Sequence, residues 1–290
     1  MLKKRLIPCL ILKDGLIVQS IQFKRYLPIG KAGIAVEFVS NWDVDEIVLI
    51  DISATKQERK PDLELIELIS KKCFVPLTIG GGIHELETIK DVIRAGADKI
   101  SINSEALNNP AFITQAADVF GAQCIVVSID VKVNDKGDYE VVADNGQIWT
   151  GKNPPEWAKE VEERGAGEIF LNSVDQDGMK QGYDLELIRQ VSDAVRIPVI
   201  ACGGVGQFEH LVDGVEKGHA SAVAAGNIFH YTEHSTIVAK AYLQNKDVPV
   251  RLNTAAKYDG FTFDEHGRIQ KRDDQDLENI WFERSVKEKI

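Results

Sequence analysis

Two stretches of similar sequence decide the fold: Pro76-Leu-Thr-Ile-Gly-Gly-Gly-Ile83 and Pro198-Val-Ile-Ala-Cys-Gly-Gly-Val205. Each joins an apolar run to a glycine cluster. Each is followed at the same offset by a helical pattern, Glu85–Gly96 after the first and Gln207–Gly218 after the second. A repeated strand-and-helix unit indicates an internal duplication. We therefore expect a functional feature in one half of the chain to have a counterpart in the other half.

The repeat extends upstream, where Asp45-Glu-Ile-Val-Leu49 resembles Gly167-Glu-Ile-Phe-Leu171. Along the whole chain, short apolar runs alternate with amphipathic helical stretches. Nearly continuous apolar runs favour parallel strands that are buried on both faces. Strands that alternate with helices predict an α/β fold, here a (β/α)₈ TIM barrel with a half-barrel internal repeat. The eight strand-like runs are Leu6–Ile11, Ile47–Ile50, Val75–Ile79, Lys99–Ile102, Cys124–Ile129, Glu168–Leu171, Pro198–Cys202 and Ala222–Ala225.

The length of 290 residues fits one barrel with an appendage. We expect the barrel over residues 1–252 and a short C-terminal extension over residues 253–290. In the extension we expect a hairpin around His266-Gly267 and a helix over Asp273–Lys289. The apolar stripe of that helix packs on the barrel's own surface or docks a further protein. The stripe consists of Leu277, Ile280, Trp281 and Val286.

The composition excludes several classes of function. The net charge is -11 and no basic stripe is present, which argues against binding to nucleic acid or to a membrane surface. No apolar run is long enough to span a bilayer. The four cysteines have no metal-ligand spacing, so we expect reduced thiols in a cytoplasmic protein. No metal and no cofactor is expected.

Glycine corners follow the strands at corresponding places in the two halves. In a barrel of this kind the site lies at the carboxyl ends of the strands. Glycine lets backbone N–H groups approach a phosphate closely, so two repeat-related corners predict a substrate with two phosphate groups. The residues predicted to bind it are Gly81, Gly82, Asn103, Ser104, Gly203, Gly204, Ala225 and Gly226.

Carboxylates also end the apolar runs. Asp130 ends the fifth strand, and burial at the mouth of the barrel would raise its pKa and suit it to proton transfer. A helix cap or a salt bridge is the alternative reading. Asp51 ends the second strand, and Asp177-Gly178 follows the sixth; these residues bind substrate hydroxyl groups or are solvated turn residues.

The chain resembles the HisF cyclase subunits of imidazole glycerol phosphate synthase from Leu2 to about Leu252. The resemblance rests on ordered motifs that are spread over the whole barrel. These motifs are Lys4-Arg-Leu-Ile-Pro-Cys-Leu10, Lys13-Asp-Gly15, Leu49-Ile-Asp-Ile-Ser53, Gly80-Gly-Gly-Ile-His84, Gly96-Ala-Asp-Lys-Ile-Ser-Ile-Asn103, Asp130, Glu163-Arg-Gly-Ala-Gly-Glu168, Asp175-Gln-Asp-Gly178 and Gly182-Tyr-Asp184.

The resemblance implies a barrel that takes ammonia from a glutaminase partner of the HisH type, with two aspartates as general acid and base. Asp130 is the second of these aspartates. Isoleucine stands at position 11, where the first is expected, and isoleucine cannot move a proton. Losing one acid/base group costs about 10²–10⁴ in rate. The lyase activity of the family is therefore impaired or absent. Further departures from the family pattern are Gln19, Asn172, Cys202 and Gly226.

At the opposite end of the barrel, the resemblance implies a ring of charges that gates ammonia, together with an aspartate that faces the glutaminase active site. The ring positions are Arg5, Glu46, Lys99 and Glu168, and the aspartate is Asp98. The alternative is a ring of salt bridges that only stabilises the barrel. Buried charge networks are seldom net stabilisers, which favours a role in ammonia passage.

Three functions follow from these observations. The first is implied by a resemblance to a HisF-like branch linked to acetamidino sugar modification. It is a HisF-like synthase subunit whose ammonia serves a partner amidotransferase in the acetamidino modification of a surface-polysaccharide sugar. The second is an imidazole glycerol phosphate synthase cyclase subunit in histidine biosynthesis that tolerates Ile11. The third is a non-catalytic assembly subunit that binds a phosphorylated small molecule.

Overall fold

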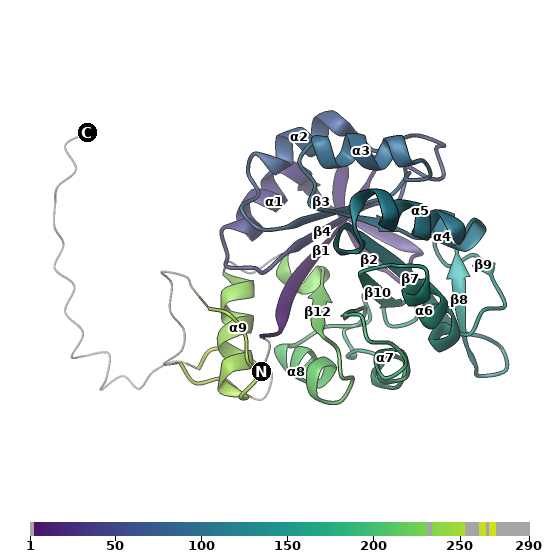
Figure 1. Cartoon of the computed structure of the whole chain (residues 1–290). Coiled ribbons are helices and arrows are strands. Elements are labelled where there is room, and N and C mark those ends of the chain that lie inside the picture. The colour runs from purple at the N-terminus through teal and green to yellow at the C-terminus, as the bar shows by residue number, and fades with distance from the viewer. Residues whose placement is uncertain (1–2, 231–233, 253–260, 265–266, 271–290) are drawn as a thin grey trace, which may run out of the picture.

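The computed structural model describes residues 3–230, 234–252, 261–264 and 267–270. Eight parallel strands form a closed barrel, with the last pairing between β7 and β10 (Figure 1). In barrel order they are β1 (Arg5–Lys13), β4 (Ile47–Asp51), β5 (Leu77–Gly80), β6 (Lys99–Ile102), β7 (Ile125–Val133), β10 (Glu168–Ser173), β11 (Val199–Cys202) and β12 (Ala222–Ala225). The predicted (β/α)₈ barrel is confirmed.

Helices lie around the outside of the barrel (Figure 1). They are α1 (Ala32–Ser40), α2 (Leu63–Ser70), α3 (Leu86–Arg94), α4 (Ser104–Asn108), α5 (Ala111–Phe120), α6 (Pro154–Glu163), α7 (Leu185–Ser192), α8 (Phe208–Glu216) and α9 (Ser235–Asn245), with 3₁₀ turns η1 (Ala122–Cys124) and η2 (Asn227–Phe229).

The half-barrel repeat is visible in how two helices begin. The side chain of Asp62 accepts a hydrogen bond from the N–H of Leu65 at the start of α2. At the corresponding place in the second half, Asp184 accepts one from the N–H of Leu187 at the start of α7. Such caps satisfy donors that the first turn of a helix leaves unpaired. The two halves therefore share local capping chemistry as well as strand order.

Two hairpins were not predicted from the sequence. The first consists of β2 (Leu16–Ile21) and β3 (Arg25–Lys31), and β2 pairs antiparallel with the end of β1. The second consists of β8 (Tyr139–Ala143) and β9 (Ile148–Trp149). Because β8 pairs with β7, β7 continues to Val133. The prediction that Asp130 ends its strand was therefore wrong: Asp130 lies within β7.

Apolar side chains fill two separate regions. The larger region lies between the strands and the helices. The smaller one lies inside the barrel, where inward-facing residues of several strands meet. It consists of Ile7, Cys9, Val48, Val126, Phe170, Ile200, Ala222 and Ala224. The middle of the barrel is thus mostly apolar, apart from the hydrogen-bonded hydroxyl groups of Ser101 and Ser128, and it separates two polar ends.

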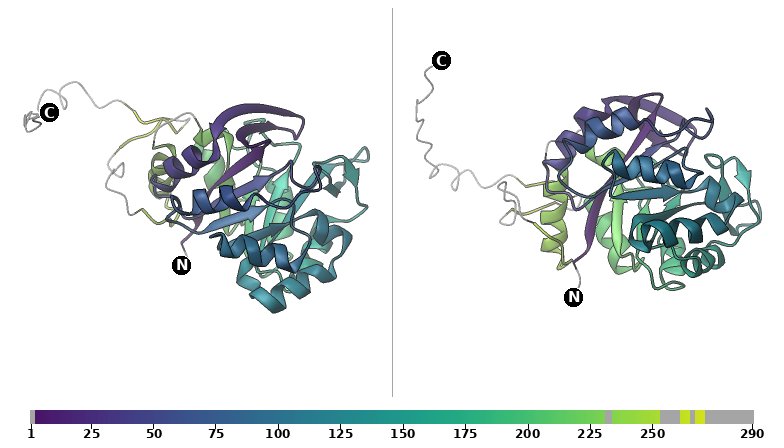
Figure 2. Two further views of the ribbon diagram at one scale, coloured as in Figure 1. Left: turned by 90° about the horizontal axis from the view of Figure 1, so that it is seen from above. Right: turned by 45° about the horizontal axis from the view of Figure 1, so that its top comes forward.

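Beyond α9, the described part of the extension returns to the surface of the barrel (Figure 2). Phe263 pairs antiparallel with Ile269, and its ring centroid lies 5.3 Å from that of Tyr242 on α9. The helix expected over residues 273–289 lies outside the described residues. Over the described ranges, no helix has the length and apolar character needed to cross a membrane.

Candidate functional site

A cavity of about 390 Å³ opens at the carboxyl ends of the barrel strands. A cavity of this size accommodates a small molecule. The structure brings to it every residue that the sequence predicted for the mouth. Its lining includes Ile11, Asp51, Gly81, Gly82, Asn103, Ser104, Asp130, Asn172, Asp177, Gly178, Gly203, Gly204, Ala225 and Gly226.

The two glycine corners have conformations that only glycine adopts easily. Gly81 and Gly204 have φ angles of +102° and +105°. A Cβ atom on Gly81 would lie 2.1 Å from the carbonyl oxygen of Asp51, and one on Gly204 would lie 2.0 Å from that of Gly182. Close backbone approach at both corners leaves room at the mouth for a ligand that contacts main-chain N–H groups.

Asp130 is held on one side of the mouth by two amide side chains. Asn103 donates from Nδ2 to Oδ2 of Asp130 at 2.7 Å, and Asn172 donates to Oδ1 at 3.4 Å. Burial raises the pKa of Asp130 to about 6, although both amide hydrogen bonds act in the opposite direction. A carboxyl group with this pKa exchanges protons near neutral pH, which suits acid/base work.

The wall that faces Asp130 is apolar. β1 and β7 lie on opposite sides of the barrel because three strands separate them on each side. Ile11 projects from β1 into the cavity beside Ile50 and Val18, among the other residues that line it. Within the described residues, no carboxylate on β1 lines the cavity opposite Asp130. The mouth therefore has a carboxylate on β7 and, among the described residues of β1, no carboxylate opposite it.

Two other predicted carboxylates have protein partners. Asp51 accepts from Nη2 of Arg59 at 2.7 Å and from the N–H of Ser53 at 2.9 Å. Asp177 accepts from the hydroxyl of Ser20 at 2.5 Å and from the N–H of Phe23 at 3.3 Å. Burial raises the pKa of Asp177.

These contacts give Asp177 a role that sequence reasoning missed, because it fastens the β2–β3 hairpin beside the mouth. Further contacts hold the same hairpin: the N–H of Gln22 donates to the carbonyl of Asp177 at 2.9 Å, and Nδ2 of Asn227 donates to that of Ser20 at 2.8 Å. Ser20 carried no recognisable signal, because its partner Asp177 lies 157 positions away, and Arg59, in the loop that follows Asp51, was also missed.

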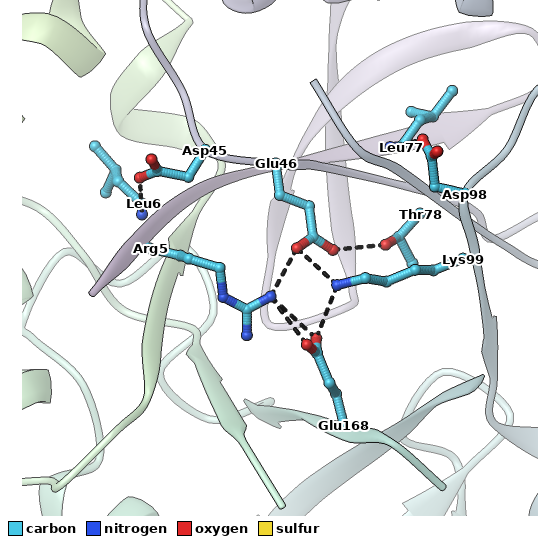
Figure 3. A network of polar contacts seen from close by, with 9 residues as sticks. All are labelled: Arg5, Leu6, Asp45, Glu46, Leu77, Thr78, Asp98, Lys99 and Glu168. Carbon is cyan, nitrogen blue, oxygen red and sulfur yellow. Dashed lines mark hydrogen bonds and ion pairs between the residues drawn. The ribbon is translucent and has the colours of Figure 1, made fainter. Parts of the chain in front are cut away.

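At the other end of the barrel, the predicted ring of four charges is closed (Figure 3). Nη1 of Arg5 lies 2.8 Å from Glu46 and 3.0 Å from Glu168. Nζ of Lys99 lies 2.9 Å from Glu46 and 3.2 Å from Glu168. Thr78 also donates to Glu46, at 2.7 Å. Only 2% of the Glu46 side chain is exposed, so this carboxylate lies deepest in the ring.

Asp98 is exposed, and its Oδ2 accepts a hydrogen bond from the N–H of Leu77 at 2.8 Å (Figure 3). Asp98 directly precedes Lys99 in the chain and lies beside the ring. It therefore supports the start of β5 and still presents a charged group at this face of the barrel.

A metal centre finds no support in the side chains. Over the described ranges, no three His, Cys, Asp or Glu residues are grouped so as to hold a metal ion. The carboxylates at the mouth instead contact amides, a hydroxyl, a guanidinium group and backbone N–H groups.

Comparison with known proteins agrees with this arrangement. The family described as "Histidine biosynthesis protein" matches residues 5–235. A protein of Vibrio vulnificus (strain YJ016), named as a candidate imidazole glycerol phosphate synthase subunit hisF2, is 49% identical over 268 residues, which cover 92% of this chain and 98% of that protein. The chain therefore belongs to the histidine biosynthesis protein family, as a HisF-like (β/α)₈ barrel.

Proposed function

We propose that this chain is the synthase subunit of an ammonia-transfer complex. A glutaminase of the HisH type docks at the charged ring and releases ammonia into the barrel, and the ammonia leaves at the mouth. A partner amidotransferase uses it for the acetamidino modification of a surface-polysaccharide sugar. A phosphorylated small molecule occupies the two glycine corners.

The closed ring is the observation that carries this proposal. Arg5, Glu46, Lys99 and Glu168 close one end of the barrel, and an apolar layer that includes Ile7 lies beyond them. Charged and hydrated species pay a large desolvation cost in such a layer, whereas neutral ammonia does not. The same four charges bring little net stability to the barrel itself.

The mouth supports an acceptor other than the family's own substrate. Asp130 faces Ile11, so the pair of carboxylates that the resemblance implies is incomplete. A site with one acid/base group catalyses the reaction about 10²–10⁴ times more slowly than a site with a pair. A barrel that delivers ammonia needs its ring and its apolar layer, but it does not need the second aspartate.

One observation favours a second function, that of a cyclase subunit of imidazole glycerol phosphate synthase. The pKa of Asp130 is about 6, which leaves this group able to give or take a proton near neutral pH. The Vibrio vulnificus relative carries the name of such a subunit. Under this alternative, Asp130 acts with a substrate group or with water in place of the missing aspartate.

Labelled ammonia tests the leading proposal. The full chain is mixed with the HisH-type glutaminase and the sugar amidotransferase of the same organism, with ¹⁵N-amide glutamine and an excess of unlabelled ammonium. We expect a stable complex with the glutaminase and a product that retains ¹⁵N, because channelled ammonia does not mix with the bulk. Absence of the complex, or a product that carries only the isotope of the bulk ammonium, would contradict the passage of ammonia through the barrel.

The same experiment distinguishes ammonia transfer from the function of a non-catalytic assembly subunit. A purely structural subunit binds inorganic phosphate or a phosphate ester and joins the complex, but it leaves the isotope ratio of the product equal to that of the bulk ammonium. A Glu46→Ala variant provides an internal comparison, because it opens the ring and leaves the mouth residues in place.

A further inference from the structure

A lysine on the outer helix α9 is completely buried. Lys240 has no exposed surface, and its Nζ forms ion pairs without hydrogen-bond geometry within the described structure, at 3.0 Å from Oδ1 of Asp45 and 3.8 Å from Oδ2 of Asp43. Lysine is almost never fully buried unless it is paired, because removing its charge from water is costly. Helix α9 is buried along nearly its whole length, from Ser235 to Leu243, so no side of it gives this lysine access to solvent. The charge of Lys240 is therefore compensated inside the protein.

Both of its partners belong to the connection between α1 and β4. Asp43 has a φ of +56°, in the left-handed region that aspartate adopts more readily than most residues other than glycine. Thr236, one turn before Lys240 on α9, donates to the carbonyl oxygen of Trp42 in the same connection. Helix α9 thus contacts this segment at Trp42, Asp43 and Asp45.

Asp45 transmits this restraint to β1. Its Oδ2 accepts from the N–H of Leu6 at 2.8 Å, and its own N–H donates to the carbonyl of Leu6 at 3.1 Å (Figure 3). Leu6 follows Arg5 in the chain, and Asp45 precedes Glu46. The two hydrogen bonds therefore hold together the two backbone segments that carry the oppositely charged ring residues Arg5 and Glu46.

We propose that Lys240 is a positioning residue for the charged ring: its ion pair with Asp45 fixes the two hydrogen bonds to Leu6 and so sets the separation of Arg5 from Glu46. The inference deepens the proposed function, since the ring is there the passage for ammonia. The positioning itself concerns only this chain, and it can be measured without any partner.

The experiment compares three full-length variants by ¹⁵N NMR. Lys240→Met keeps the length of the side chain and removes its charge. Asp45→Asn keeps the shape of the acceptor and weakens the same ion pair, so it carries the test if Lys240→Met does not fold. Lys246→Met is the matched control, because Lys246 lies just beyond the end of α9, is exposed, and pairs with Glu209 at 3.5 Å.

The readouts are the side-chain ¹⁵N resonances of Arg5 and Lys99 and the hydrogen exchange of the Leu6 amide. We expect the first two variants to shift the ring resonances and to speed exchange at Leu6 by at least about tenfold, since local opening becomes easier. The control leaves all three signals at their wild-type values. Ring resonances that stay unchanged in a folded but less stable Lys240→Met protein would show that Lys240 only fills the core.

A second measurement separates this inference from the proposed function. In the ¹⁵N-glutamine experiment, Lys240→Met lowers the fraction of label retained in the product, whereas Lys246→Met does not. If the wild-type chain binds no glutaminase but Lys240→Met still shifts the ring resonances, the positioning role is supported and the proposed ammonia transfer is contradicted. If the wild-type chain channels ammonia but Lys240→Met does not shift the ring resonances, the ammonia transfer is supported and the positioning role is contradicted.

Discussion

The two ends of the barrel differ in how their charges are compensated. In the ring, two acids and two bases alternate, and every charged group has partners of opposite sign at 2.8–3.2 Å. At the mouth, Asp130 has only amide donors, and across the barrel it faces Ile11. The ring is complete as the family resemblance implies, and the acid/base pair is not.

This contrast has consequences for energy as well as for chemistry. A buried network loses much when one partner is removed, because the remaining charges become uncompensated. A buried carboxylate without a counter-charge is costly already, so neutralising it relieves the fold. Removing the charge of Glu46 in the ring and of Asp130 at the mouth should therefore change the stability of the protein in opposite directions.

The largest effect is expected in the ring. Glu46→Ala removes the carboxylate that pairs with both Arg5 and Lys99 and accepts from Thr78. We expect the free energy of unfolding, measured by urea denaturation at pH 7, to fall by about 3–5 kcal/mol. Glu87→Ala breaks an exposed pair with Lys90 and should cost less than about 1 kcal/mol. Equal losses in the two variants would mean that the ring is not a closed network.

The glycine corners come next. Gly204→Ala places a methyl group against the carbonyl of Gly182 at a φ of +105°, so we expect a loss of roughly 2–4 kcal/mol and weaker phosphate binding. Gly137→Ala is the matched control, because its φ is +87° and a Cβ there meets nothing within 4 Å. Unfolding curves and phosphate titrations check both variants. Phosphate binding that survives in Gly204→Ala argues against a site at this corner.

Asp130 gives an effect of opposite sign that depends on pH. Its pKa is raised from 3.8 to about 6 in the folded protein, so ionisation destabilises the fold. The destabilisation is absent below about pH 4, grows between pH 4 and pH 6, and is complete above. Asp130→Asn should therefore stabilise the protein at pH 8, by roughly 3 kcal/mol at most, and change little at pH 3.5. A stability difference that is the same at both pH values would contradict the raised pKa.

The smallest effect is expected at the hairpin beside the mouth. Ser20→Ala removes the hydroxyl that donates to Asp177 and should cost about 1 kcal/mol. Hydrogen exchange at the Gln22 amide, which donates to the carbonyl of Asp177, should become faster. Ser192→Ala serves as the control, because the Ser192 hydroxyl is buried and makes no hydrogen bond within the described structure. Unchanged exchange in Ser20→Ala would mean that other contacts hold the hairpin.

The fold and the mouth were predictable because the determining signals are local. Continuous apolar runs predict the parallel strands, and the residues that follow them must gather at one end of a barrel. The β2–β3 hairpin was missed because Gln22 and Phe23, which have positive φ angles at its turn, are not typical turn residues. The second hairpin turn contains Asn145-Gly146, a dipeptide that favours hairpin turns, so this hairpin does have a local signal in the sequence.

The remaining features could not be predicted from the sequence because they depend on contacts between residues that lie far apart in the chain. The burial of Lys240 depends on two aspartates nearly two hundred positions away, and a lysine ordinarily indicates an exposed position. Likewise, the role of Asp177 in fastening the β2–β3 hairpin depends on Ser20, which lies 157 positions away. Charge compensation is a property of the folded barrel, and no local pattern contains it.

The most direct test of the account is ammonium-driven turnover of the bisphosphate substrate of imidazole glycerol phosphate synthase, measured for the purified chain and for Ile11→Asp. The account predicts no turnover by the native chain and partial recovery in the variant, whose new carboxylate faces Asp130 across the mouth. Turnover by the native chain, unchanged or lowered in Ile11→Asp, would contradict it and return the protein to the cyclase reaction.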